Sequence, residues 1–170
     1  RHALTVEGCM RHFAALAGED VELWGVVGLL HDLDYEQYPD EHCKKVQEIL
    51  REKDVDPAII RAVASHGFGI CSDIEPESRM EKTLYAIDEL TGLITAAAIM
   101  RPSKSVMDLE LKSVKKKYKT PSFAAGVNRA VVEQGAQRLG TTVDELINQC
   151  ILGMRECAPA IGLAGDAPEA

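Results

Sequence analysis

The segment Trp24-Gly-Val-Val-Gly-Leu-Leu-His31-Asp32-Leu-Asp34-Tyr-Glu36 decides how this chain folds. Its first seven residues are apolar or glycine, which predicts a helix buried in the middle of the protein. His31 and Asp32 then follow side by side at the end of that helix. Because a buried carboxylate without a partner is strongly destabilising, the pair requires one. A metal cation would serve, with both side chains as ligands; the alternative is a neutral core histidine beside a capping aspartate.

Composition limits the class of protein. The chain has 170 residues, of which 46% are hydrophobic and 27% charged, as expected for one globular domain with a core. The net charge of −8 argues against general binding to a nucleic-acid backbone. No apolar run approaches the roughly 20 residues that a membrane span needs, and no signal peptide is recognisable. We therefore expect a cytoplasmic protein, and because Arg1 is not methionine we expect further residues upstream.

Cysteine usage agrees with that compartment. The five cysteines are scattered, odd in number and form no Cys-x-x-Cys pair. This pattern favours reduced thiols and argues against a zinc finger or a disulfide framework. Cys43 is expected to be a small packed residue.

Apolar spacing and capping residues predict an all-α chain. Gly18, Asp20, the pair Asp56-Pro57 and the capping box from Thr142 to Glu145 are typical of helix ends and starts. Predicted helices cover 1–17, 21–32, a segment opening at 39–40, 58–66, 76–100, a short stretch within 112–119, 127–139 and 142–157. Arg101-Pro102 divides a first half, 1–100, from a smaller C-terminal half, 101–157, and residues 158–170 form a loosely ordered tail.

Imidazole and carboxylate side chains lie at or near the ends of the predicted helices of the first half. These metal-type ligands are His2, His31, Asp32, His42, His66 and Asp88. Helix ends can converge on one pocket in a bundle, and bundle interiors commonly hold di-metal centres. Six such groups exceed the needs of one tetrahedral zinc and suit two metals about 3.5–4 Å apart, with Asp32 as the natural bridge.

The ordered pattern His…His-Asp…His…His…Asp resembles the HD-domain superfamily of metal-dependent phosphohydrolases over roughly residues 1–100. The resemblance implies an all-α, HD-domain-like helical bundle, here with extra C-terminal helices. It assigns His2, His31, Asp32 and Asp88 to a first metal and His42 and His66 to the second metal of dinuclear members. Phe68-Gly69-Ile70 replaces the extended signature of the cyclic-dinucleotide phosphodiesterase branch, so the chain looks most like the stand-alone predicted hydrolases of the superfamily.

The resemblance implies hydrolysis of a nucleotide or another small phosphate ester by a metal-activated water. One or two divalent ions are expected, and the ligands admit Mn, Fe, Co, Ni or Zn. The catalytic candidates are His31, Asp32 and Asp34; Asp34 and Glu36 are either solvated loop acids or proton shuttles. Two other functions stay open: a di-iron oxygenase of HD type and a non-catalytic domain that senses a nucleotide.

The basic segment from Lys112 to Lys119 has two interpretations. It is either a solvated helix face or a lid whose lysines meet a substrate phosphate. The candidates for substrate binding are Lys112, Lys115, Lys116, Arg101, Arg129 and Thr91, which lies one turn after Asp88. His12 is ten residues from His2 and is expected on another side of its helix, outside the ligand set.

Overall fold

The computed structural model describes residues 1–165, and its elements are arranged around the long helix α5, Arg79–Ile99. The described part of the chain is helical and contains no β-strand, which confirms the predicted all-α class. Five helices pack on α5: α1 (His2–Ala17), α4 (Pro57–Ser65), α6 (Leu111–Tyr118), α7 (Arg129–Leu139) and α8 (Val143–Glu156). None of the helices in residues 1–165 has the length and apolar character that crossing a membrane demands.

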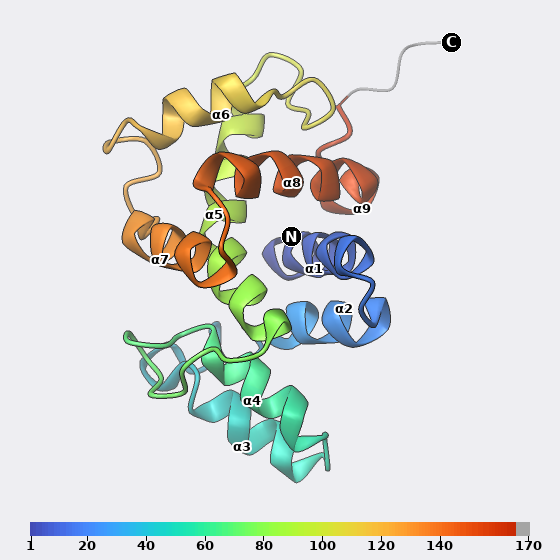
Figure 1. Ribbon diagram of the computed structural model, residues 1–170, viewed down its shortest axis with the longest axis vertical. Coiled ribbons are helices and arrows are strands. Elements are labelled where there is room, and N and C mark those ends of the chain that lie inside the picture. Colours follow the sequence, from blue (N-terminus) through green and yellow to red (C-terminus); the bar gives the residue numbers. More distant parts are fainter. Residues whose placement is uncertain (166–170) are drawn as a thin grey trace.

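The remaining elements lie around this central helix (Figure 1). α2 (Val21–Leu30) forms a helical hairpin with α1, and α3 (Lys45–Glu52) pairs with α4 at one end of the molecule. α6 lies at the opposite end, beside α8 and the last turns of α5. This arrangement places the start of α1 and the ends of α2 and α4 around the middle of α5.

Predicted caps fix several of these helices. Gly18 ends α1 in the left-handed conformation, with φ of 67°, and its N–H donates to the carbonyl of Ala14. The carboxylate of Asp20 accepts from the N–H of Leu23 at the start of α2. Asp56 caps α4 before Pro57, and Thr142 accepts from Glu145 at the start of α8. The sequence therefore predicted these boundaries through local hydrogen bonding.

Two predicted helix starts are wrong. The long helix begins at Arg79 rather than at residue 76, because Ser78 and Glu81 form a reciprocal capping box there. The segment after Pro39 forms only a short 3-10 turn, η1 (Pro39–Glu41), and α3 begins at Lys45. Between them Cys43 has a φ of 71°, a left-handed conformation that interrupts a helix. His42 therefore lies in a loop, not at a helix start.

The C-terminal segment differs from the prediction of a loosely ordered tail. Ala158–Ile161 form a short helix, α9, and Ala158, Ile161 and Leu163 are buried. The carbonyl of Leu163 accepts hydrogen bonds from Val106 N and Ser105 Oγ. Residues 166–170, which belong to the same prediction, lie outside the described residues. Buried side chains on both sides of the predicted boundary at 101–102 belong to one hydrophobic cluster.

Gly135 allows α7 to pack directly on α5. A Cβ at this position would lie 2.5 Å from the Cβ of Ala86, so the two helices have to separate to admit it. We expect Gly135→Ala to lower the free energy of unfolding by about 1–3 kcal/mol, as over-packing does. Gly92→Ala is the matched control on α5, because nothing lies within 4 Å of its added Cβ. Chemical denaturation of both variants measures the difference, and equal stabilities would contradict the account.

Candidate metal centre

Four helices and one loop bring together the six predicted metal ligands. His2 comes from the first turn of α1, His31 and Asp32 follow the last turn of α2, His66 follows α4, and Asp88 lies in the middle of α5. His42 comes from the loop before α3. Because α1 and α4 pack on α5, and α2 packs on α1 and α4, the cluster is held by the core rather than by exposed loops alone.

One half of the cluster contains His2, His31 and Asp88. Oδ1 of Asp88 lies 2.8 Å from Nε2 of His2 and 3.0 Å from Nε2 of His31. Oδ2 of Asp32 faces the same two nitrogens, at 3.5 and 3.3 Å. Ligand atoms bound about 2.0–2.1 Å from one tetrahedral ion are separated by about 3.3–3.4 Å. These four side chains therefore have the spacing of one metal's ligands.

The other half of the cluster contains His42 and His66. Their Nε2 atoms are 3.1 Å apart. Oδ1 of Asp32 lies 3.3 Å from Nε2 of His42 and 3.4 Å from Nε2 of His66. The three atoms form a nearly equilateral triangle, which is the arrangement of three ligands on one metal. The two oxygens of Asp32 thus face two different sets of imidazoles.

Hydrogen bonds at the opposite ring nitrogens fix how the imidazoles present themselves. Nδ1 of His31 donates to the carbonyl of Gly28 at 2.6 Å, and Nδ1 of His66 donates to the carbonyl of Val63. Nδ1 of His42 donates to Oδ1 of Asp34 at 2.6 Å. In the neutral ring these bonds leave Nε2 with a lone pair directed at the cluster. Lone pairs and carboxylate oxygens that face one another require a cation between them.

The titration of these groups reflects the same need for positive charge. Burial opposes the charged forms, but the carboxylates of Asp88 and Asp32 outweigh it and raise the pKa of His31 well above its ordinary value. Burial likewise opposes ionisation of both carboxyls, yet the surrounding imidazoles hold the pKa of Asp32 and of Asp88 far below the usual range. A proton on His31 would supply positive charge to these carboxylates, and a bound metal ion would supply it instead.

Asp34 is buried, so the expectation of a solvated loop acid is wrong for this residue; Glu36 is exposed as expected. Besides holding His42, the carboxylate of Asp34 accepts from the backbone N–H of Val46 at 2.9 Å, in the first turn of α3. Asp34 therefore orients an imidazole and caps a helix at once. Its geometry is that of a positioning residue.

The comparison with protein families agrees with this geometry. The family model described as HD domain matches residues 1–93, which is more than half of the chain. The chain belongs to the HD domain family. HD domains bind divalent metals, and the family commonly comprises metal-dependent phosphohydrolases. No curated protein and no solved structure matches the chain significantly.

The structure does not bring the basic substrate-binding candidates to the cluster. α6 carries the lysine segment at the end of the molecule opposite α3 and α4 (Figure 1). Lys115 pairs with Asp144, and Arg101 pairs with Asp108. Arg129 donates to the backbone carbonyls of Tyr118, Thr120, Phe123 and Ala124. Lys112 and Lys116 are exposed on the same helix. The charges of this segment thus serve local folding or face solvent.

Thr91 and His12 are also engaged elsewhere. The hydroxyl of Thr91 is buried and donates to the carbonyl of Asp88, one turn earlier on α5. His12 contacts Glu156 and Gln149 on α8, and it lies outside the ligand set as predicted.

Two adjoining cavities open beside His42. Their linings include residues that the sequence analysis did not identify. The smaller, about 90 Å³, is lined by His42, His66, Asp88, Tyr85 and Glu89 among others. Burial and the neighbouring Asp88 carboxylate raise the pKa of Glu89. The larger, about 610 Å³, is lined by His42, Lys44, Gln47 and the segment 69–74. The available sequence signal was position: Glu89 directly follows Asp88, and Lys44 lies two residues after His42.

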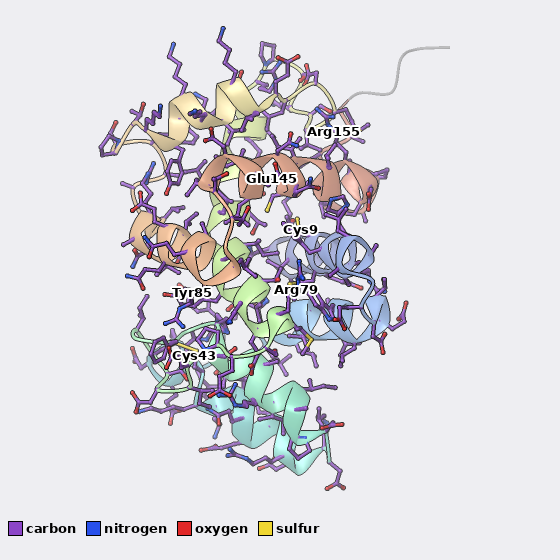
Figure 2. All side chains as sticks on the ribbon, in the orientation of Figure 1. Cys9, Cys43, Arg79, Tyr85, Glu145 and Arg155 are labelled. Atoms are coloured by element: carbon purple, nitrogen blue, oxygen red, sulfur yellow. A yellow bond between two sulfur atoms is a disulfide. The ribbon has the colours of Figure 1, made fainter. Side chains whose placement is uncertain are left out.

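Cys43, labelled in Figure 2, forms a disulfide with Cys71, and its sulfur lies 4.0 Å from Nε2 of His66 in the cluster. The expectation of reduced thiols is wrong for this pair, whereas Cys9, Cys150 and Cys157 are free. Cys43 is fully buried, as expected of a small packed residue. Sequence spacing alone did not reveal the pair, because the fold brings together two loops whose cysteines are 28 residues apart.

Asp34→Asn tests the orientation of His42. An asparagine amide cannot accept from both His42 Nδ1 and Val46 N as the carboxylate does. We expect the affinity for a metal ion at His42 and His66 to fall by about 10–100-fold. The affinity for an ion at His2, His31 and Asp88 should not change. Titration calorimetry with Mn²⁺ or Co²⁺ measures this.

Glu36→Gln is the matched control, because it removes one carboxylate charge from the same loop at an exposed position. Identical metal affinities in the two variants would contradict the positioning role of Asp34.

Proposed function

We propose that this protein is a metal-dependent phosphohydrolase that acts on a nucleotide or another small phosphate ester. The observation that carries the proposal is the placement of Asp32. Its Oδ2 lies among His2, His31 and Asp88, while its Oδ1 lies 3.3 and 3.4 Å from Nε2 of His42 and His66. A carboxylate so placed suits a bridge between two divalent ions, a centre typical of hydrolysis at phosphorus.

The side chains of this cluster would hold the two metal ions in a fixed geometry. His2, His31 and Asp88 would bind one ion, His42 and His66 the other, and Asp32 both. When bound, the ions supply Lewis acidity that acidifies a water and stabilises negative charge on a phosphoryl group. Asp34 keeps the ring of His42 in one tautomer, and the carbonyls of Gly28 and Val63 do so for His31 and His66.

The larger cavity is the best place for the rest of the substrate. It adjoins His42 and has about 610 Å³, within the range of small-molecule sites. Lys44 lines it and is exposed, so an ammonium group is available for an anionic substrate. Arg138 holds both ends of the segment that contributes residues 69–74 to this cavity: it pairs with Glu75, and its guanidinium lies over the ring of Phe68 as well as that of Tyr85. The loop 68–75 is therefore anchored to α7.

Metal content tests the centre directly. We expect two divalent ions per chain in the parent protein and one in His66→Ala. Asp32→Ala should hold none or one weakly bound ion, because the carboxylate of Asp32 faces both sets of imidazoles. Metal analysis after dialysis against a stated free metal concentration gives the ratios. His12→Ala is the control, since this histidine contacts α8 and should leave the ratio unchanged.

Substrate turnover tests the reaction. A panel of phosphomonoesters, phosphodiesters and nucleotides, assayed with and without oxygen, should reveal hydrolysis that persists anaerobically. Turnover that stops without oxygen would contradict the proposal and favour the di-iron oxygenase. Tight nucleotide binding without turnover at full metal occupancy would favour a sensing domain.

Lys44→Ala tests substrate anion binding in the cavity. A lost charge-assisted contact to phosphate should raise KM by about tenfold or more, and more at low salt than at high salt. Lys116→Ala is the matched control, because it removes an exposed lysine from α6, away from the cluster. Equal KM values for the two variants at low salt would contradict a role for Lys44.

A further inference from the structure

The disulfide between Cys43 and Cys71 connects the two loops that carry the second set of imidazoles. Cys43 follows His42 directly, and Cys71 lies five residues after His66. Sγ of Cys43 is 4.0 Å from Nε2 of His66, and His42, Cys43 and His66 each offer a ligand atom within 4.8 Å of the others. Around one metal a thiolate and an imidazole nitrogen are separated by about 3.6 Å. The sulfur of Cys43 is thus close to a ligand position.

The sulfur of Cys43 is held beside His66 by its surroundings. Cys43 adopts a φ of 71°, which is uncommon for a residue with a side chain, and its side chain is fully buried. Gly67, next to His66, leaves the space that the sulfur occupies: a Cβ there would lie 2.5 Å from Sγ of Cys43. The added Cβ would also meet Sγ of Cys71, so Gly67 leaves room beside His66 for both sulfurs of the disulfide.

The two cysteines differ in access. Cys71 is only partly buried and lines the larger cavity together with Lys44 and Ser72, whereas Cys43 is buried against His66. A small thiol entering that cavity would meet the sulfur of Cys71. Attack there releases the sulfur of Cys43 as a thiolate beside the cluster.

We propose that Cys43 is an additional ligand of the metal at His42 and His66, available only when the bond to Cys71 is open. An external dithiol supplies the two electrons and two protons that open the bond, and leaves as a cyclic disulfide. Metal binding then releases the thiol proton of Cys43. In the disulfide form this half of the centre has only nitrogen and oxygen ligands. In the dithiol form it gains a soft ligand that favours thiophilic ions such as Zn²⁺.

This inference rests on the proposed metal centre, and the experiment separates the two. The full chain is prepared oxidised or reduced with a dithiol, which is removed before anaerobic loading with Co²⁺. Free thiols should increase by two per chain on reduction. We expect a near-ultraviolet thiolate-to-cobalt charge-transfer band in the reduced protein, and loss of that band after reoxidation.

Three variants assign the band. Cys71→Ser should show it without prior reduction, because Cys43 then has no partner. Cys43→Ser should bind Co²⁺ without the band in either state, and Cys157→Ser, which changes a free cysteine elsewhere, should behave as the parent protein. Cobalt bound equally in both states without the band would overturn the inference and leave the proposed function intact. No cobalt bound in either state would overturn both.

Discussion

The constraint on which the site depends is the position of one carboxylate between two groups of imidazoles. Asp32 follows an apolar helix whose packing on α1 and the core leaves its side chain no freedom to reach solvent fully; the side chain is 25% exposed. Negative charge there is tolerable only because His2, His31, His42 and His66 surround it, each within 3.5 Å. The same geometry that stabilises the carboxylate also leaves both of its oxygens directed at separate sets of nitrogen ligands.

Much of the fold was predictable because its signals are local. Gly18, Asp20, Asp56 and Thr142 act within one turn of their own helices, so capping chemistry located those boundaries. The start of α3 was not predictable in this way, because the carboxylate that caps it belongs to Asp34, twelve residues earlier in the chain. The packing of α9 was missed for a similar reason: the burial of Leu163 depends on contacts with residues 105 and 106.

The residues of the candidate site also differ in how far local sequence reveals them. His31 and Asp32 are conspicuous in sequence because they directly follow an apolar helix, and Asp88 because it lies within one; the fold needs all three paired. Residues that act through space were harder to interpret. Asp34 was a catalytic candidate, but its contacts with His42 and Val46 were not foreseen. Lys44 looked like an ordinary surface lysine, and Cys43 and Cys71 looked like unrelated thiols. The lysine segment is conspicuous in sequence by its concentrated charge, but it lies on α6, away from the cluster, as a solvated helix face would.

The central claim is that Asp32 bridges two metal ions. The most direct test is an anomalous difference map from crystals of the protein grown with Mn²⁺ or Zn²⁺. The account predicts two peaks about 3.5–4 Å apart, one among His2, His31 and Asp88 and the other beside His42 and His66, with Asp32 between them. A single peak at full occupancy, or peaks that do not contact Asp32, would contradict it.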